Sequence, residues 1–329
     1  MKYSKDDLAF LKFRHAKQRS SNEPMTGKVC VISGATSGVG LEAAKRLAKG
    51  RAELVLVSRN AQKAQAVQAM LQETYGAKVH LVSADFARLE DVRKAATLIC
   101  ARWDRLDVLI NSAGLHCTRR QETADGNELV FQVNHLAPFL LTALLLGPLS
   151  RAPQARVIQV NSEGHRFGGL NLGDLDWKRR PYIGLRAYGA SKIAQIAAVK
   201  ELAERLKGKG ITANAMHPGG VRTGIGSNNG LLYRAWMRLV IRHFLKDPAI
   251  SGDALYYLSA APELSGTSGE YFHLTLEAKP LQRALDQELR AAVWERTLLL
   301  CGLSPQFLQD AVGNQLAGED GDGQAGGAE

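Results

Sequence analysis

A tyrosine and a lysine stand one helical turn apart in the stretch Tyr188-Gly189-Ala190-Ser191-Lys192, within a segment patterned as a helix. Residues at positions i and i+4 share one helix face, so the phenol and the ammonium group point the same way. A free tyrosine has a pKa of about 10, and a neighbouring cation lowers that pKa because it stabilises the phenolate. The pair therefore suits acid/base chemistry near neutral pH. Such pairs are common by chance, so the significance of this pair depends on the other polar residues that the sequence places near it.

Two further polar residues stand where they could assist the pair. Ser162 follows an apolar, strand-like run at 155–161, and open α/β sheets bind ligands at the carboxyl ends of their strands. Its hydroxyl could hold the oxygen of a substrate. Asn134 lies within an apolar helical run, where a buried amide needs partners. We expect a helix distortion there with a bound water that reaches Lys192; a satisfied core amide is the alternative.

A histidine close to Ser162 raises the alternative of a serine hydrolase. His165 stands three residues after the serine. Serine hydrolases of the α/β class expose their nucleophile on a G-x-S-x-G turn, and no such turn surrounds Ser162. We therefore place His165 among the candidate substrate residues.

A glycine-rich turn, SGATSGVG at 33–40, joins a β-branched run at 28–33 to a helical pattern at 38–49. Glycines at such a junction let the backbone approach a ligand closely, and the unpaired N–H groups at the helix start attract an anion. A dinucleotide pyrophosphate is the natural anion there; an ordinary strand-to-helix turn is the alternative. The residues assigned to this site are Gly34, Thr36, Ser37, Gly38, Val39 and Gly40.

The end of the second strand indicates which dinucleotide binds. Arg59 stands there, without the carboxylate that would bind a ribose 2′-hydroxyl. A guanidinium suits a 2′-phosphate, so we expect NADP(H) rather than NAD(H); a solvated charge at a helix start is the alternative. Later strand ends complete the predicted cofactor site, with Asp85 and Phe86 at the adenine edge. Where the backbone passes close to the cofactor, the sequence places Asn111, Ala113 and Gly114.

The hydrophobic pattern predicts the scaffold for these residues. Strand-like runs at 28–33, 53–58, 78–84, 106–111, 155–161, 211–216 and 269–273 alternate with helical segments at 38–49, 61–74, 89–102, 127–150, 186–207 and 249–261. This alternation predicts an α/β fold with a doubly wound, Rossmann-like parallel sheet. We expect one domain over 27–303, an N-terminal extension at 1–26 and a largely disordered tail at 304–329.

The stretch 224–248, after the sixth strand, interrupts the alternation and is rich in apolar residues. Within it, basic residues recur every four positions and so share one helix face; they are Arg234, Arg238, Arg242 and Lys246. We expect either a lid over a lipophilic substrate, resting near an anionic membrane surface, or an amphipathic helix packed on the core. In both cases the pocket wall is apolar, with Leu231 and Trp236 as candidate substrate residues.

The composition narrows the class of partner and the compartment. The formal net charge is +10, but no basic run is longer than Lys178-Arg179-Arg180, so we expect no nucleic-acid partner. The four cysteines form no CxxC pair, which suits a reducing compartment, and we expect no metal site. No signal peptide or transmembrane segment is recognisable in the sequence. We expect a cytoplasmic protein, with peripheral membrane contact as an alternative.

Six motifs in order, SGATSGVG, NSAG, VNH, NSEGH, YGASK and HPGGVRT, resemble those of the short-chain dehydrogenase/reductase family over about residues 26–300. NHLAPFLLT, NSEGH and HPGGVRT resemble its retinol dehydrogenase-like branch, whose relatives include protochlorophyllide reductases. The resemblance implies a homo-oligomer and a catalytic tetrad in which Tyr188 and Lys192 also touch the cofactor. That tetrad is Asn134, Ser162, Tyr188 and Lys192, and the residues implied on the nicotinamide side are Pro218, Gly219, Val221 and Thr223.

The chain departs from the pattern of the branch at Ala137-Pro138, where Gly-His is usual, and at Asn161, which replaces a serine. The predicted function is that of an NADP(H)-dependent oxidoreductase of EC 1.1.1 type. It would interconvert a lipophilic aldehyde or ketone, retinal-like compounds included, and the corresponding alcohol, with a tyrosine as acid/base. The alternatives are a reductase of C=C bonds in enones or tetrapyrroles, and a nucleotide-binding regulator without turnover.

Overall fold

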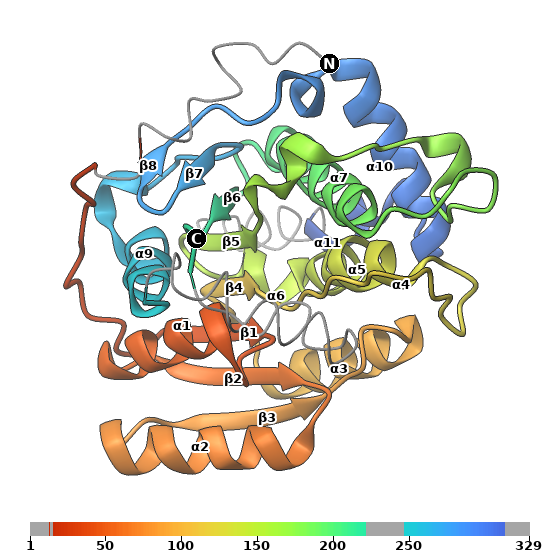
Figure 1. Ribbon diagram of the computed structural model, residues 1–329. Coiled ribbons are helices and arrows are strands. Elements are labelled where there is room, and N and C mark those ends of the chain that lie inside the picture. Colours follow the sequence, from red (N-terminus) through yellow and green to blue (C-terminus); the bar gives the residue numbers. More distant parts are fainter. Residues whose placement is uncertain (1–12, 14–15, 222–246, 313–329) are drawn as a thin grey trace, which may run out of the picture.

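The computed structural model describes residue 13 and residues 16–221 and 247–312. At its centre lies an eight-stranded sheet in the order β3-β2-β1-β4-β5-β6-β7-β8 (Figure 1). All neighbouring strands are parallel except β7 and β8 (Leu276–Glu277), which are antiparallel. The parallel strands are β1 (Val29–Ser33), β2 (Glu53–Ser58), β3 (Val79–Ser83), β4 (Val108–Asn111), β5 (Ala155–Val160), β6 (Ile211–His217) and β7 (Tyr271–His273). The predicted doubly wound sheet is confirmed.

Helices cover both faces of the sheet, which explains why the strands are continuous apolar runs. One face packs against α1 (Gly38–Lys49), α2 (Ala61–Tyr75) and α9 (Ala249–Ala260). The other packs against α3 (Leu89–Arg102), α5 (Ala137–Leu144), α7 (Gly184–Arg205) and α10 (Gln287–Cys301). The helical run predicted at 127–150 is interrupted. It comprises α4 (Leu129–Phe131), a π-helix (Gln132–Leu136), α5 and α6 (Leu146–Ser150).

The C-terminal boundary differs from the prediction. Residues 304–312 were expected to begin a largely disordered tail, but α11 (Phe307–Val312) packs on the core. The ring of Phe307 stacks on Trp294 of α10, with centroids 5.9 Å apart. Six residues are too few for a hydrophobic period to be recognised, so the sequence pattern gave no signal for this helix. The remainder of the predicted tail, 313–329, lies outside the described residues.

Part of the predicted N-terminal extension also belongs to the folded domain. The main-chain N–H of Arg19 donates to Thr275 Oγ1 at 2.8 Å, and Thr275 Oγ1 donates to Gln18 Oε1 at 2.8 Å. Met25 is buried, and its N–H donates to the Gly50 carbonyl at 2.8 Å. The domain therefore begins before residue 27. Among the helices in the described ranges, none combines the length and apolar character that a membrane crossing requires.

The topology fixes where a ligand can sit. Strand β1 lies between β2 and β4. The strand order therefore runs in opposite directions from the neighbouring strands β1 and β4, which form the switch point of the sheet. In open α/β sheets, ligands bind at the carboxyl ends of the strands beside such a switch point. The loops after β1, β2, β3, β4 and β5 all leave the sheet at that edge. The predicted lid lies almost wholly within 222–246, outside the described residues.

Candidate active site

Ser162, Tyr188 and Lys192 come together at the carboxyl end of β5. The Ser162 side chain, directly after this strand, is hydrogen-bonded to the phenol of Tyr188. Lys192 Nζ lies 5.5 Å from the centroid of the Tyr188 ring. It donates to the Val160 carbonyl at 3.1 Å and to Gln195 Oε1 at 2.9 Å. The helix α7 therefore presents the phenol and the ammonium group to one place, as their spacing predicts.

Burial dominates the electrostatics of this cluster. It raises the pKa of Tyr188 to about 12, while the hydrogen bond from Ser162 acts in the opposite direction. Burial also lowers the pKa of Lys192 to about 7. Both shifts disfavour the charged form of the group. A phenolate at neutral pH therefore needs a further positive charge beside it.

Asn134 is buried within the π-helix, so the expected helix distortion is present. Its side-chain amide accepts from the N–H of Leu115 at 2.8 Å and donates to the Leu115 carbonyl at 3.0 Å. It also donates to Ser191 Oγ at 3.0 Å. Where we expected a water between Asn134 and Lys192, the structure places a side chain. Gln195 Nε2 donates to the Asn134 carbonyl.

The glycine-rich turn has the features of an anion site. Ser37, extended, precedes α1 without capping it through its side chain, and within this described helix the first turn carries no acid. The N–H groups there therefore suit a pyrophosphate. Gly34 serves a second purpose, because its φ is +74° and a Cβ would lie 2.7 Å from Ala113 Cα. This glycine lets the turn pack closely against the loop after β4.

At the ends of β2 and β3, Arg59 is 70% exposed in its side chain and its Nη1 lies 3.8 Å from Asp85 Oδ2. The guanidinium is therefore accessible to a ligand. Phe86, expected at the adenine edge, is buried in the core, which leaves only its main chain to face a nucleotide. Asn111 is also buried; its Nδ2 donates to Thr142 Oγ1 at 2.9 Å and so joins β4 to α5.

The residues implied on the nicotinamide side follow β6. Gly219 adopts φ +79° and Val221 is buried. The Pro218 carbonyl accepts a hydrogen bond from Ser251 Oγ at 2.7 Å, which joins this turn to α9. Three predicted residues lie outside the described ranges, namely Thr223, Leu231 and Trp236.

His165 has a structural role that its sequence position did not show. Its ring is buried, Nδ1 lies 2.7 Å from the Ser162 carbonyl, and Nε2 accepts from the Leu281 N–H at 3.1 Å. Since Leu281 is the donor at Nε2, we assign the ring proton to Nδ1. The ring therefore presents no free nitrogen to a substrate, contrary to our expectation. It links the loop of Ser162 to the segment before α10.

The protonation of His165 predicts a loss of stability in acid. Burial lowers its pKa to about 4, below the ordinary value of about 6.5, so folding favours the neutral ring. This stabilisation is complete above about pH 6.5 and is lost as the pH falls toward 4. In urea denaturation, we expect this group to lower the free energy of unfolding by roughly 2–3 kcal/mol over that window. The fall should be smaller in His165→Gln; an equal fall in the variant would contradict the assignment.

Sequence reasoning gave no site role to two amides, Asn161 and Gln195, and it missed a cluster of one glutamate and two histidines. Asn161 Nδ2 donates to the Lys192 carbonyl at 3.0 Å and to Gln195 Oε1 at 3.0 Å. Gln195 stands three residues after Lys192, and this helical spacing was an available signal for it. Glu163, His217 and His273 offer metal-ligand atoms within 4.8 Å of one another. Their positions are remote in sequence, so no spacing motif could identify them.

The charge pattern around that cluster does not favour a cation. Arg166 Nε lies 2.5 Å from Glu163 Oε2, and Tyr271 donates to Glu163 Oε1 at 3.3 Å. Both carboxylate oxygens are therefore already engaged, one of them by a positive charge. We therefore assign these three residues a structural role.

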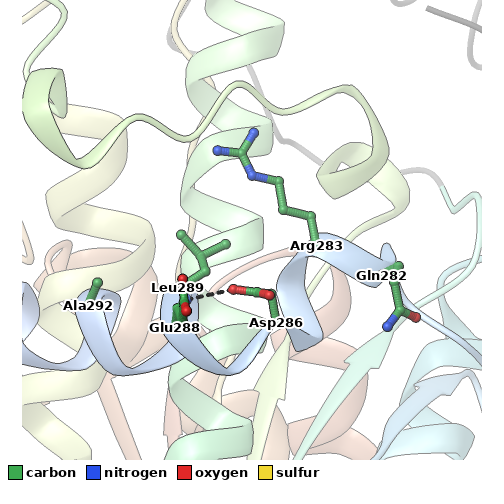
Figure 2. Close-up of a pocket in the computed structure, with 6 residues that line it drawn as sticks. All are labelled: Gln282, Arg283, Asp286, Glu288, Leu289 and Ala292. Carbon is green, nitrogen blue, oxygen red and sulfur yellow. Dashed lines mark hydrogen bonds between the residues drawn. The ribbon is translucent and has the colours of Figure 1, made fainter.

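A surface cavity of about 550 Å³ lies beside the N-terminus of α10 (Figure 2), and Tyr188 is not among the residues that line it. Asp286 caps the helix there by accepting from the Leu289 N–H at 2.8 Å. Arg283 extends from the preceding turn and donates to the Leu170 carbonyl at 3.2 Å. No predicted site residue is among the side chains that line this cavity, and we assign it no role in the chemistry.

Known proteins resemble this chain over most of its length. The family model for short chain dehydrogenases matches residues 28–231. Human retinol dehydrogenase 13 is 34% identical over 295 residues, which cover 88% of this chain and 89% of the relative. The human WW domain-containing oxidoreductase is 36% identical over 303 residues, covering 88% and 70%. Among solved structures, an uncharacterised protein from Mycobacterium paratuberculosis has a TM-score of 0.69 at 28% identity and covers 88% of this chain and 99% of its own.

Proposed function

The chain belongs to the short-chain dehydrogenase family and its retinol dehydrogenase-like branch, and from this premise we propose that it is an NADP(H)-dependent oxidoreductase. Its substrate is a lipophilic aldehyde or ketone, or the corresponding alcohol. The observation that carries the proposal is the cluster of the buried Tyr188 and Lys192 with the half-buried Ser162 at the carboxyl edge of the sheet. The uncapped start of α1 and the exposed Arg59 support the choice of cofactor.

Each residue of the cluster has a distinct role in the proposed reaction. The bound cofactor would supply the hydride in the reducing direction. Tyr188 gives its proton to the carbonyl oxygen, and Ser162 orients that oxygen through its hydroxyl. Lys192, in its protonated form, stabilises the phenolate that Tyr188 becomes, and this acts against the effect of burial on the tyrosine pKa. Asn134 holds the loop after β4 through its bonds to Leu115.

Exposed apolar side chains support a lipophilic substrate. Phe167 is 45% exposed and lies five residues after Ser162, while Ile183 and Leu185 are 44% and 51% exposed and precede Tyr188 at the start of α7. These side chains therefore belong to the two segments that carry the serine and the tyrosine. Burial of such groups against an apolar ligand stabilises the complex by removing their surface from water.

Arg59 supplies a test of the cofactor preference. Loss of a charge-assisted bond to a 2′-phosphate costs about 1.5–3 kcal/mol, or roughly 10- to 100-fold in affinity. We expect Arg59→Ala to raise the KM for NADPH by this factor and to leave the KM for NADH nearly unchanged. The control is Arg296→Ala, which removes an exposed arginine of α10. Equal losses with both cofactors would exclude Arg59 as the discriminating residue.

The deciding experiment follows NADPH and NADH consumption by the purified protein with a panel of carbonyl compounds. The panel contains retinal, medium-chain aldehydes, aromatic ketones and an enone. Turnover of an aldehyde or ketone with NADPH would support the proposal, and the order of rates would narrow the substrate class. Saturation of the C=C bond of the enone alone would favour a C=C reductase. Tight NADPH binding without any turnover would favour a nucleotide-binding regulator.

A further inference from the structure

A proline changes which hydrogen-bond donors are available to the main-chain carbonyl of Asn134. In a regular helix the Asn134 carbonyl would accept a hydrogen bond from the N–H of the residue four positions later. That residue is Pro138, at the start of α5, and proline has no N–H. Pro138 therefore offers the Asn134 carbonyl no bond of the α-helical kind, and a side-chain donor can take that place.

Gln195 supplies that donor and faces Lys192 with its other end. The side chain is 98% buried, since only 2% of its surface is exposed. Its Nε2 donates to the Asn134 carbonyl, and its Oε1 accepts from Lys192 Nζ at 2.9 Å and from Asn161 Nδ2 at 3.0 Å. The amide therefore forms a direct link between the π-helix and the ammonium group.

The chemistry of a carboxamide determines what this link can do for Lys192. A carboxamide does not gain or lose protons near neutral pH, so it can hold the ammonium group but cannot pass a proton onward. Gln195 Oε1 and the Val160 carbonyl both accept from Lys192 Nζ, and acceptors of this kind favour the protonated amine. The same side chain occupies the place where a water between Lys192 and Asn134 was expected.

We propose that Gln195 is a positioning residue for Lys192, and that its amide fixes the ammonium group against the Asn134 carbonyl, to which Pro138 can donate no hydrogen bond. The proposal deepens the function proposed above and rests on it for the role of Lys192. In this role Gln195 acts through the lysine and not on substrate or cofactor directly.

The test compares Gln195→Leu with Gln159→Leu. Gln159 is also buried and donates to a main-chain carbonyl, that of Asn111 at 3.4 Å, so the control makes the same substitution away from Lys192. The first readout is independent of turnover: competitive acetylation of the free protein by acetic anhydride, with Lys192 followed by mass spectrometry between pH 5.5 and 9. Loss of an acceptor favours the neutral amine. We therefore expect Lys192 to be labelled about 6- to 10-fold faster at pH 6 in Gln195→Leu, and at the normal rate in Gln159→Leu.

The other titratable groups that face Lys192 do not confuse this measurement. They are the phenol of Tyr188 on the same helix, His135 on the π-helix and His217 at the end of β6. Burial lowers the pKa of His135 to about 3 and lowers that of His217. Both rings are therefore neutral above pH 5.5. Burial also keeps the phenol protonated across the range.

Repeating the comparison in the Pro138→Ala variant distinguishes a positioning role of Gln195 from simple structural support. In Pro138→Ala, residue 138 regains an N–H that can serve the Asn134 carbonyl, so Gln195→Leu should cost less stability there. The faster labelling of Lys192 should persist, because the lysine still lacks its acceptor. If the labelling effect vanishes together with the stability cost, or is absent from the outset, the positioning role is wrong.

Turnover provides the final readout. Misplacement of the lysine should lower kcat about 10- to 100-fold, with little change in the KM for the carbonyl compound. An unchanged kcat with altered labelling would overturn the role of Gln195 in catalysis. The failure of the proposed function has a different signature. In that case the wild-type protein turns over no carbonyl compound, whereas the labelling of Lys192 still responds to Gln195→Leu.

Discussion

Replacement of Tyr188 by phenylalanine is expected to lower kcat by roughly 10²- to 10⁴-fold, the usual contribution of a positioned acid/base group. The phenol is the one group of the cluster that can give a proton to a carbonyl oxygen, because Lys192 is turned toward the Val160 carbonyl and Gln195. The ring itself remains and still fills its buried place. We therefore expect NADPH binding, followed by nucleotide fluorescence, to change little.

The comparison needs a tyrosine that lies elsewhere in the fold. Tyr75 closes α2 and is only half-buried, so Tyr75→Phe removes a hydroxyl without touching the cluster. It should keep full activity. Retention of activity in Tyr188→Phe would contradict the proposed mechanism. Loss of NADPH binding in that variant would show that the hydroxyl binds the nucleotide instead.

The sheet was predictable because its signal is local. Strands such as β1 and β2 are buried on both faces, so each had to be a continuous apolar run, and the helices between them repeat on one face. The clustering of Ser162 with Tyr188 followed from the same logic, since one ends a strand and the other lies in the next long helix. The helix α11 escaped prediction because six residues carry no measurable period.

The polar interior of the site was less predictable because its contacts join distant segments. Gln195 bonds to a carbonyl 61 residues away in the chain, and Leu281 bonds to His165 across 116 residues. No periodicity reports such pairings. Pro138 was visible in the sequence as a departure, but its consequence depends on which side chain reaches the Asn134 carbonyl, to which a proline cannot donate. The oligomeric state, the compartment and membrane contact stay predictions, because no contact within one chain reports on them.

Replacement of Gly189 by alanine should reverse the usual sign of a helical glycine substitution. Glycine to alanine in a helix interior normally stabilises by about 1 kcal/mol. Here α7 packs so closely on the turn after Ser162 that a Cβ at Gly189 would lie 2.5 Å from the Gly164 carbonyl oxygen and 2.5 Å from Gly168 Cα. Overpacking of this kind costs typically 1–3 kcal/mol. We expect net destabilisation of up to about 2 kcal/mol in urea denaturation, the difference between these two effects.

We expect a larger loss of activity than the loss of stability alone would cause, because the contact between α7 and the turn after Ser162 sets the distance between Ser162 and Tyr188. The Gly164 N–H donates to Ser162 Oγ at 3.1 Å, so displacement of this turn moves the serine hydroxyl away from the phenol. A shift of about 1 Å at reacting groups costs roughly 100-fold in rate, and we expect kcat/KM in Gly189→Ala to drop by that factor. Gly147 of α6 is the matched control, since a Cβ there meets nothing closer than 3.9 Å. Gly147→Ala should be as stable as the wild type or more so, and fully active. If Gly189→Ala behaves in the same way, the close approach of α7 to this turn does not hold the serine in place.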